Sequence, residues 1–187
     1  MQVRDVVFQY SPSYGSPAIE IRYPAHLDTA LTYVGVTESG GKNTGVEIDR
    51  FLASVGLGGG YAWCAAFVSY CLEVAQPSPA SPAVRSALAR HFKVPGYAID
   101  IRTAVASNMK YQQGWIVGWK RGHTIFGHVG FIIEGQGANM ITVEGNTSPG
   151  NRGSQSDGGG VHIRNRQYVA SNYLRMDWIL PVTYHDD

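Results

Sequence analysis

The chain has 187 residues, of which 44% are hydrophobic and 16% are charged, and 23 of them are glycine. This length and composition favour one folded, loop-rich domain and exclude a disordered chain. The net charge of +1 indicates neither a nucleic-acid partner nor an anionic membrane surface.

The start of the chain lacks the apolar segment and small-residue cleavage site of a secretion signal. No run of the sequence approaches the roughly 20 apolar residues that a membrane-spanning helix requires. We therefore expect a protein that is synthesised in the cytoplasm without a signal peptide and has no membrane span. A count of two cysteines fits a reducing compartment.

Helices are predicted in the first half of the chain. Residues 1–24 carry Pro12 and Pro17 and are predicted to form an extended N-terminal arm. Helical spacing of apolar residues then predicts short helices over residues 25–34 and 46–55, and a third helix that begins at Cys64.

Prolines from residue 77 onward end the third helix, because proline disfavours helix in the residue before it. Pro82 is predicted to be the first residue of a further helix, capped by Ser81 and ending near Phe92. Residues 97–109 are predicted to contain another turn or helix.

From Gly114 onward the sequence is rich in β-forming residues. The predicted strands cover residues 115–119, 128–134, 140–144, 161–166 and 178–182. Because helices precede strands, the sequence predicts a single α+β domain over residues 25–187, with an antiparallel sheet.

Cys64 stands at a predicted helix start, directly after a glycine run that cannot join the helix without a large entropic cost. Unpaired backbone N–H groups and the helix dipole stabilise a thiolate there, which is the nucleophilic form of cysteine. The alternative is an ordinary buried cysteine, and the helix alone does not separate the two. Cys71 is predicted to lie in the core. Its Cα atom would be roughly 10 Å from that of Cys64, which is too far for a disulfide.

The predicted strands at 128–134 and 140–144 form a hairpin that carries a candidate base, His128. Side chains alternate along a strand, so Glu144 and Asn146 share a face. His128 lies opposite Glu144 if the turn is centred near residue 136, and opposite Asn146 if it is centred near residue 137. A histidine can take the proton of a thiol, and an acceptor at its other nitrogen fixes the tautomer. Either Glu144 or Asn146 could be that acceptor.

The alternatives to this site are structural residues or a metal centre. His128 could be an ordinary strand histidine, although glycines on both sides of it indicate close approach by another group. Glu144 and Asn146 could form a solvated strand end, and His123 is the rival base. His123 and His128 have a zinc-like spacing, but the intervening glycine and strand start argue against shared ligation, so we expect no metal. The other histidines are expected to be surface or structural residues: His26, His91, His162 and His185.

Three motifs together resemble the CHAP family, the cysteine, histidine-dependent amidohydrolases and peptidases, which are papain-like enzymes that cut peptidoglycan. They are residues 63–68 around Cys64, residues 127–131 around His128, and residues 143–146 with Glu144 and Asn146. The resemblance covers roughly residues 28–182. It implies a papain-like fold in which N-terminal helices, with the nucleophile at a helix N-terminus, pack on a C-terminal antiparallel sheet.

The resemblance also implies the catalytic roles. Cys64 would be the nucleophile, His128 the base, Glu144 the third member and Asn146 a fourth that orients the histidine or polarises the substrate carbonyl. The implied activity is hydrolysis of bacterial peptidoglycan, by an N-acetylmuramoyl-L-alanine amidase or a peptide endopeptidase, through a cysteine thioester. No aspartate-rich calcium loop precedes the nucleophile, so no cofactor is expected.

Two other functions fit the same residues. One is a non-catalytic domain of the same fold that binds wall fragments, and the other is a cysteine amidohydrolase or acyltransferase for a small substrate. Four aromatic residues are the candidate substrate-binding side chains: Tyr61, Trp63, Trp115 and Trp119. We expect a monomer that reaches the wall after lysis or by dedicated delivery, as a phage lysin, a tail component or a toxin. An immunity protein, holin or tail partner is left undetermined.

Overall fold

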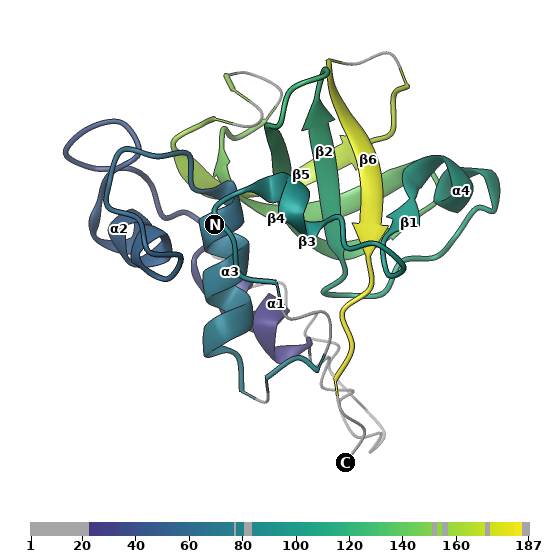
Figure 1. Ribbon diagram of the computed structural model, residues 1–187, viewed down its shortest axis with the longest axis horizontal. Coiled ribbons are helices and arrows are strands. Elements are labelled where there is room, and N and C mark those ends of the chain that lie inside the picture. The colour runs from purple at the N-terminus through teal and green to yellow at the C-terminus, as the bar shows by residue number, and fades with distance from the viewer. Residues whose placement is uncertain are drawn as a thin grey trace, which may run out of the picture.

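The computed structural model describes residues 23–76, 78–80, 84–150, 153–154, 157–170 and 173–184. Figure 1 shows helices gathered on one side of a sheet, and these are α1 (Ala25–Thr32), α2 (Val46–Ala53) and α3 (Cys64–Val74). The bounds of α1 and α2 agree with the predicted helices to within two residues. Within the described ranges, no helix is long and apolar enough to cross a membrane.

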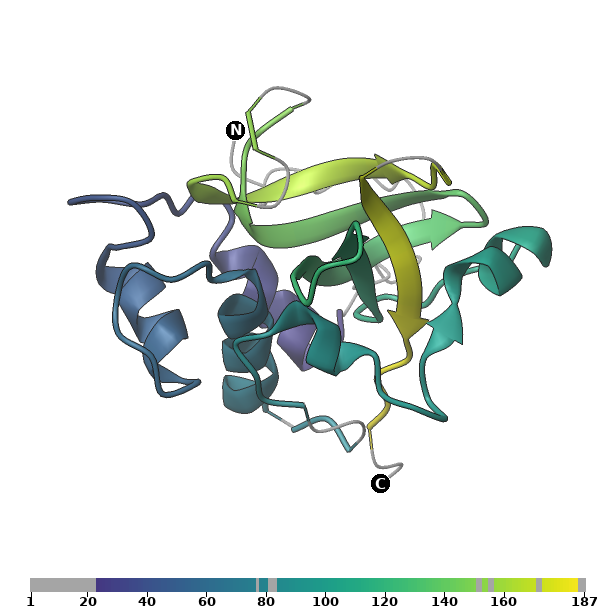
Figure 2. The ribbon, with the colours of Figure 1, turned by 45° about the horizontal axis from the view of Figure 1, so that its top comes forward.

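The central element of the helical layer is α3. It packs against α1 and α2 on one side and against β3 and β4 on the other, and Figure 2 shows it between α2 and the sheet. Most of its side chains are buried. The helix begins where the glycine run ends, and its first turn closes with the Phe67 N–H donating to the Trp63 carbonyl oxygen (2.8 Å). The predicted helix start at Cys64 is therefore confirmed.

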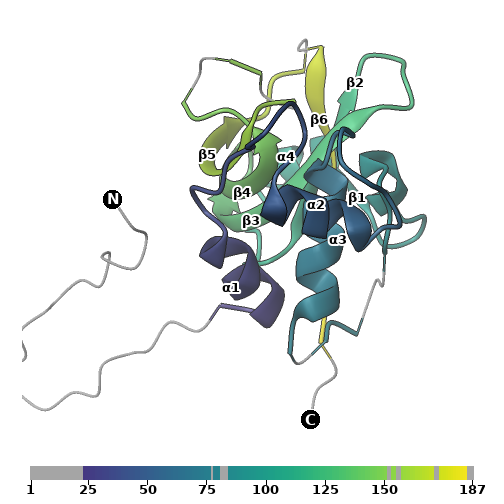
Figure 3. The same cartoon turned by 90° about the vertical axis from the view of Figure 1, so that its left-hand side faces the viewer.

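The sheet has six strands in the order β1-β6-β2-β3-β4-β5, and every neighbouring pair is antiparallel. Its strands are β1 (Ile99–Asp100), β2 (Ile116–Arg121), β3 (Gly127–Gln136), β4 (Asn139–Thr147), β5 (Gly160–Gln167) and β6 (Leu174–Leu180). Figure 3 shows the helices in front of the sheet. Helices first and an antiparallel sheet afterwards confirm the predicted α+β, papain-like fold.

The sheet buries apolar side chains on both faces. On the helical face, Phe67 of α3 belongs to one core cluster with Phe131 and Val143. On the opposite face, Ile132 and Met140 belong to a second cluster, which includes residues of the short helix α4 (Ile101–Ala106). Neighbouring residues of a strand therefore face different clusters, as the alternation of side chains along a strand requires.

The helix predicted from Pro82 to Phe92 is wrong over residues 84–88, which are not helical. Only the 3-10 helix η2 (Ala89–Phe92) forms at its end, and Ser81 and Pro82 lie outside the described residues. The side chain of Ser69 accepts the Ser86 N–H (3.0 Å), and the Ser86 side chain accepts the Leu88 N–H (3.0 Å). The Ser86 bond is local and the Ser69 bond comes from α3, and both hold backbone N–H groups of this segment outside a helix.

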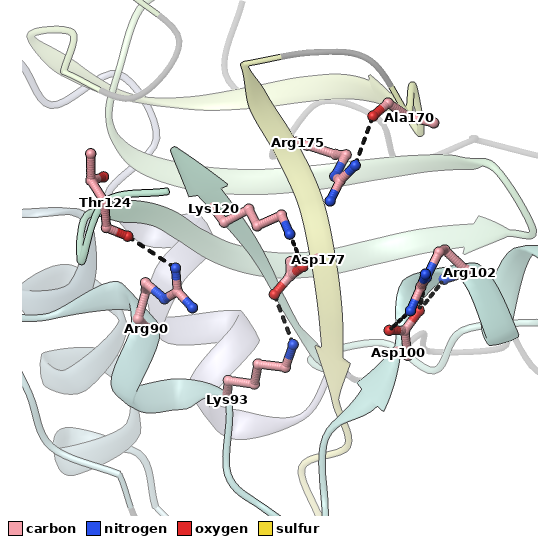
Figure 4. Close-up of polar contacts among 9 residues, drawn as sticks. All are labelled: Arg90, Lys93, Asp100, Arg102, Lys120, Thr124, Ala170, Arg175 and Asp177. Carbon is pink, nitrogen blue, oxygen red and sulfur yellow. Dashed lines mark hydrogen bonds and ion pairs between the residues drawn. The ribbon is translucent and has the colours of Figure 1, made fainter. Parts of the chain in front are cut away.

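A small charge network joins η2 to the sheet on the outer surface. Asp177 of β6 accepts from Lys93, which follows η2 (2.8 Å), and forms an ion pair with Lys120 of β2 (3.3 Å), as Figure 4 shows. The predicted arm over residues 1–24 lies outside the described residues, except for residues 23 and 24.

Candidate active site

Cys64 is the first residue of α3, and only 5% of its surface is exposed. The N-cap residue, Trp63, makes no side-chain cap hydrogen bond to the first turn of this helix. Cys71 lies further along the same helix, is fully buried, and has a pKa that burial raises well above the usual value. The two cysteines therefore differ as predicted, with Cys64 at the helix end and Cys71 in the core.

His128 on β3 is fully buried, and its Nε2 atom lies 2.7 Å from Oε2 of Glu144. Its Nδ1 atom is buried and has no hydrogen-bond partner among the described residues. Burial alone lowers the pKa of His128, but the side chains of Cys64 and Glu144 more than offset this and raise it to about 9. Because Glu144 occupies Nε2, Nδ1 is the ring nitrogen that is left for another partner.

The carboxylate of Glu144 is fully buried and is contacted by three side chains. It accepts hydrogen bonds from Thr142 Oγ1 (2.6 Å), from Arg166 Nε (2.7 Å) and Arg166 Nη2, and it contacts Nε2 of His128. Burial alone raises the pKa of Glu144, but the bonds from Arg166 and His128 lower it to about 2. Glu144 is therefore ionised at neutral pH.

Gly130 gives the Glu144 side chain its path to the histidine. Phe131 pairs with Val143, and continuing this register puts Gly130 opposite Glu144 and His128 opposite Asn146. A Cβ atom at Gly130 would lie 2.6 Å from Cγ of Glu144, so only glycine leaves room there. The glycine beside the predicted base thus marks the close approach of its acid partner.

Asn146 contacts the segment before the nucleophile instead of the imidazole. Its Oδ1 atom accepts the Trp63 N–H (3.1 Å), and its Nδ2 atom donates to Asn43 Oδ1 (3.2 Å) and to the Gly158 carbonyl oxygen (2.9 Å). Asn146 is fully buried with a φ of 57° at a β-bulge of β4. Of the two candidate acceptors for His128, the structure therefore brings Glu144 to the ring, and Asn146 ties down the residue that precedes Cys64.

The four aromatic side chains predicted to bind substrate have different environments. Tyr61 is 57% exposed, whereas Trp63 is fully buried and donates from Nε1 to Glu38 Oε1 (3.0 Å). Trp115 is partly buried against the second core cluster. Trp119 is buried beside His128, with ring centroids 5.3 Å apart. Of these four, only Tyr61 presents a large exposed surface to a ligand.

His123, the rival base, is exposed in the turn between β2 and β3, whereas His128 is fully buried. Across the described part of the chain, no group of three or more His, Cys, Asp or Glu side chains could hold a metal ion.

The sequence did not reveal Thr142 and Arg166, the other partners of Glu144. Thr142 is two residues from Glu144 on one strand, so alternation places both on one face and was a usable signal. Arg166 comes from β5, and nothing local to the hairpin indicates it.

Residues 56–146 match the family model of the CHAP domain. This range begins just before the glycine run, ends at Asn146, and contains Cys64, His128 and Glu144. Neither a curated protein nor a solved structure matches the chain.

Proposed function

This chain belongs to the CHAP family through its residues 56–146, and on that premise we propose that it is a peptidoglycan hydrolase. CHAP domains are generally amidases or peptidases. The proposed enzyme cuts either the N-acetylmuramoyl-L-alanine amide or a peptide bond of the wall, through a thioester on Cys64. The observation that supports this best is the buried His128, which contacts Glu144 through Nε2 (2.7 Å) and keeps Nδ1 for the thiol.

In the proposed first step, the thiol proton of Cys64 already resides on Nδ1 of His128, because the pKa of His128 is raised to about 9, and the thiolate sulfur attacks the amide carbonyl carbon. The carbonyl oxygen becomes an oxyanion, and the backbone N–H of Cys64 at the start of α3 is one donor to it. The C–N bond then breaks, and His128 gives its proton to the leaving amine. The acyl group remains on sulfur as a thioester.

In the second step, water attacks the thioester and gives one proton to His128. The C–S bond breaks, a carboxylic acid leaves, and the sulfur departs as a thiolate beside the protonated His128, which restores the starting pair. The Glu144 carboxylate stabilises the imidazolium in both steps, because it is ionised and lies 2.7 Å from Nε2.

The proposal is tested with purified bacterial sacculi. We expect the wild-type protein and the Cys71→Ala variant to release soluble wall fragments, and the Cys64→Ala variant to release none. Cys71 is the matched control because it lies on the same helix, fully buried. No release by the wild type, or equal release by Cys64→Ala, would overturn the proposal.

Mass spectrometry of the fragments identifies the bond. Free peptide without sugar indicates the amidase, and new amino groups within the peptides indicate the endopeptidase. Binding to sacculi without release would instead favour a wall-binding domain. A small acyl group trapped on Cys64 would favour an amidohydrolase or acyltransferase for a small substrate.

A further inference from the structure

Arg166 joins the candidate catalytic pair to a buried tryptophan. Its guanidinium donates from Nε to Oε1 of Glu144 (2.7 Å) and from Nη2 to Oε2, so that it contacts both carboxylate oxygens. Its Cζ atom lies 5.3 Å from the ring centroid of Trp119, and the Trp119 ring lies 5.3 Å from that of His128. Arg166, Glu144, His128 and Trp119 thus form a closed ring of contacts.

A buried carboxylate stays ionised only where opposite charges or hydrogen bonds offset the cost of its desolvation. Glu144 has no exposed surface, and burial alone favours its protonated form. The charged or titratable groups that act on it are His128 on β3 and Arg166 on β5, while Arg164 on β5 adds a further attractive charge. His128 gives and takes a proton in the proposed reaction, whereas a guanidinium stays charged throughout.

We propose that Arg166 is a positioning residue, which keeps Glu144 ionised and oriented so that His128 presents Nδ1 to Cys64. This inference rests on the proposed nucleophilic role of Cys64. Two-point contact by a planar guanidinium fixes both oxygens of the carboxylate, and therefore the oxygen that contacts Nε2. The Trp119 indole lies beside both the guanidinium of Arg166 and the imidazole of His128.

The test measures the rate of Cys64 alkylation by iodoacetamide between pH 4 and pH 10, with the labelled peptide quantified by mass spectrometry. It needs no wall substrate. In the Arg166→Gln variant, Glu144 takes up a proton more readily, so we expect the acid limb of the profile to move to higher pH. A shift of one pH unit corresponds to a roughly tenfold lower rate on that limb. Arg166→Lys keeps the charge without the two-point contact, and we expect an intermediate profile.

Arg102 provides the matched control for this substitution. It contacts both oxygens of Asp100 from Nε (3.0 Å) and Nη2 (2.9 Å), as Figure 4 shows. Unlike Glu144 and Arg166, this pair is exposed. The Arg102→Gln variant removes the same kind of contact without touching Glu144. We expect it to retain the wild-type alkylation profile.

A double variant separates positioning from general stabilisation. If Arg166 acts through Glu144, then Glu144→Gln and Glu144→Gln combined with Arg166→Gln will show the same profile. An additional shift in the double variant, equal to that of Arg166→Gln alone, would overturn the inference. A folded Arg166→Gln variant with the wild-type profile would overturn it as well.

If Arg166→Gln does not fold, the Arg166→Lys variant tests the inference in its place. A wild-type pH profile of Cys64 alkylation in Arg166→Lys would refute the role of the two-point contact. Failure of the proposed function is recognised separately. It appears as intact sacculi with the wild-type protein, an outcome that leaves the alkylation comparison among variants unaffected.

Discussion

Replacing Gly130 with alanine tests how tightly the protein holds Glu144. The added Cβ atom would lie 2.6 Å from Cγ of Glu144 and 2.9 Å from the Val143 carbonyl oxygen. Carbon atoms in contact normally lie about 3.5–4.0 Å apart, so the alanine methyl overlaps Glu144 by roughly 1 Å. Val143 is paired in the sheet, and Glu144 is held by Thr142 and Arg166, so neither can move without breaking a contact.

The expected result is a loss of both stability and activity. Overpacking of a filled interior costs about 1–3 kcal/mol, and each kcal/mol lowers the Tm of a chain of this size by about 2–4 °C. Displacing Glu144 by roughly 1 Å misplaces His128, and such a displacement reduces a catalysed rate by about 100-fold. Thermal unfolding measures the first effect, and the rate of fragment release from sacculi measures the second.

Gly58 is the control position for this experiment. A Cβ atom there would meet no heavy atom within 4 Å, and the φ of Gly58 is not positive. Gly58→Ala is therefore expected to change the free energy of unfolding by less than about 0.5 kcal/mol. Wild-type Tm and release in Gly130→Ala would show that Glu144 does not pack over Gly130, and the geometry of the pair would be refuted.

Three further outcomes are expected. The pKa of His128 is raised from 6.5 to about 9, so its stabilising effect is complete below pH 6.5. The pKa of Glu144 is lowered from 4.5 to about 2, so its stabilising effect is complete above pH 4.5. The stabilisation by the pair is lost as pH rises through about 9 or falls through about 2. Urea unfolding across this pH range measures it, and Glu144→Gln should make the free energy of unfolding depend less on pH. His26 has the opposite sign, since burial lowers its pKa: acidification below pH 6.5 destabilises the fold, and His26→Gln should reduce that loss. Asn146→Gly keeps the positive φ but leaves the buried Trp63 N–H without its acceptor, so denaturant unfolding should show a loss of about 1–3 kcal/mol. Unchanged stability would contradict this hydrogen bond.

The sequence predicted the elements whose signals are local. A glycine run followed by helical periodicity set the start of α3 at Cys64, and alternation with turn residues set the hairpin that carries His128. Each signal lies within one continuous stretch of the chain, so no knowledge of the tertiary structure was needed. The helix predicted after Pro82 is wrong because Ser69, which is distant in sequence, accepts a backbone N–H of that segment. No local pattern contains that contact.

The choice between Glu144 and Asn146 also needed the structure. Parity put both on the face of His128, and the register by itself favours Asn146 as the residue directly opposite. Glu144 reaches the ring because its longer side chain passes over Gly130, while the bulge at Asn146 gives that residue a φ of 57° and turns its amide toward Trp63. The length of the glutamate side chain and the β-bulge thus decide which residue contacts His128, and the alternation of side chains along the strand shows neither.

Arg166 is the residue that the sequence was least able to reveal, and the reason is physical. Alternation places Arg164 and Arg166 on one face of β5, so either could meet an acid on β4. Thr142 pairs with Arg164 and Met140 with Arg166, and a register shift of two residues would put Arg164 opposite Met140 in place of Arg166 without moving any side chain to the other face. Glu144 keeps one positive partner throughout the proposed reaction, because Arg166 stays charged while the proton on His128 is transferred. The sequence does carry two arginines on the strand that pairs with β4, but only the pairing of the strands identifies which of them contacts Glu144.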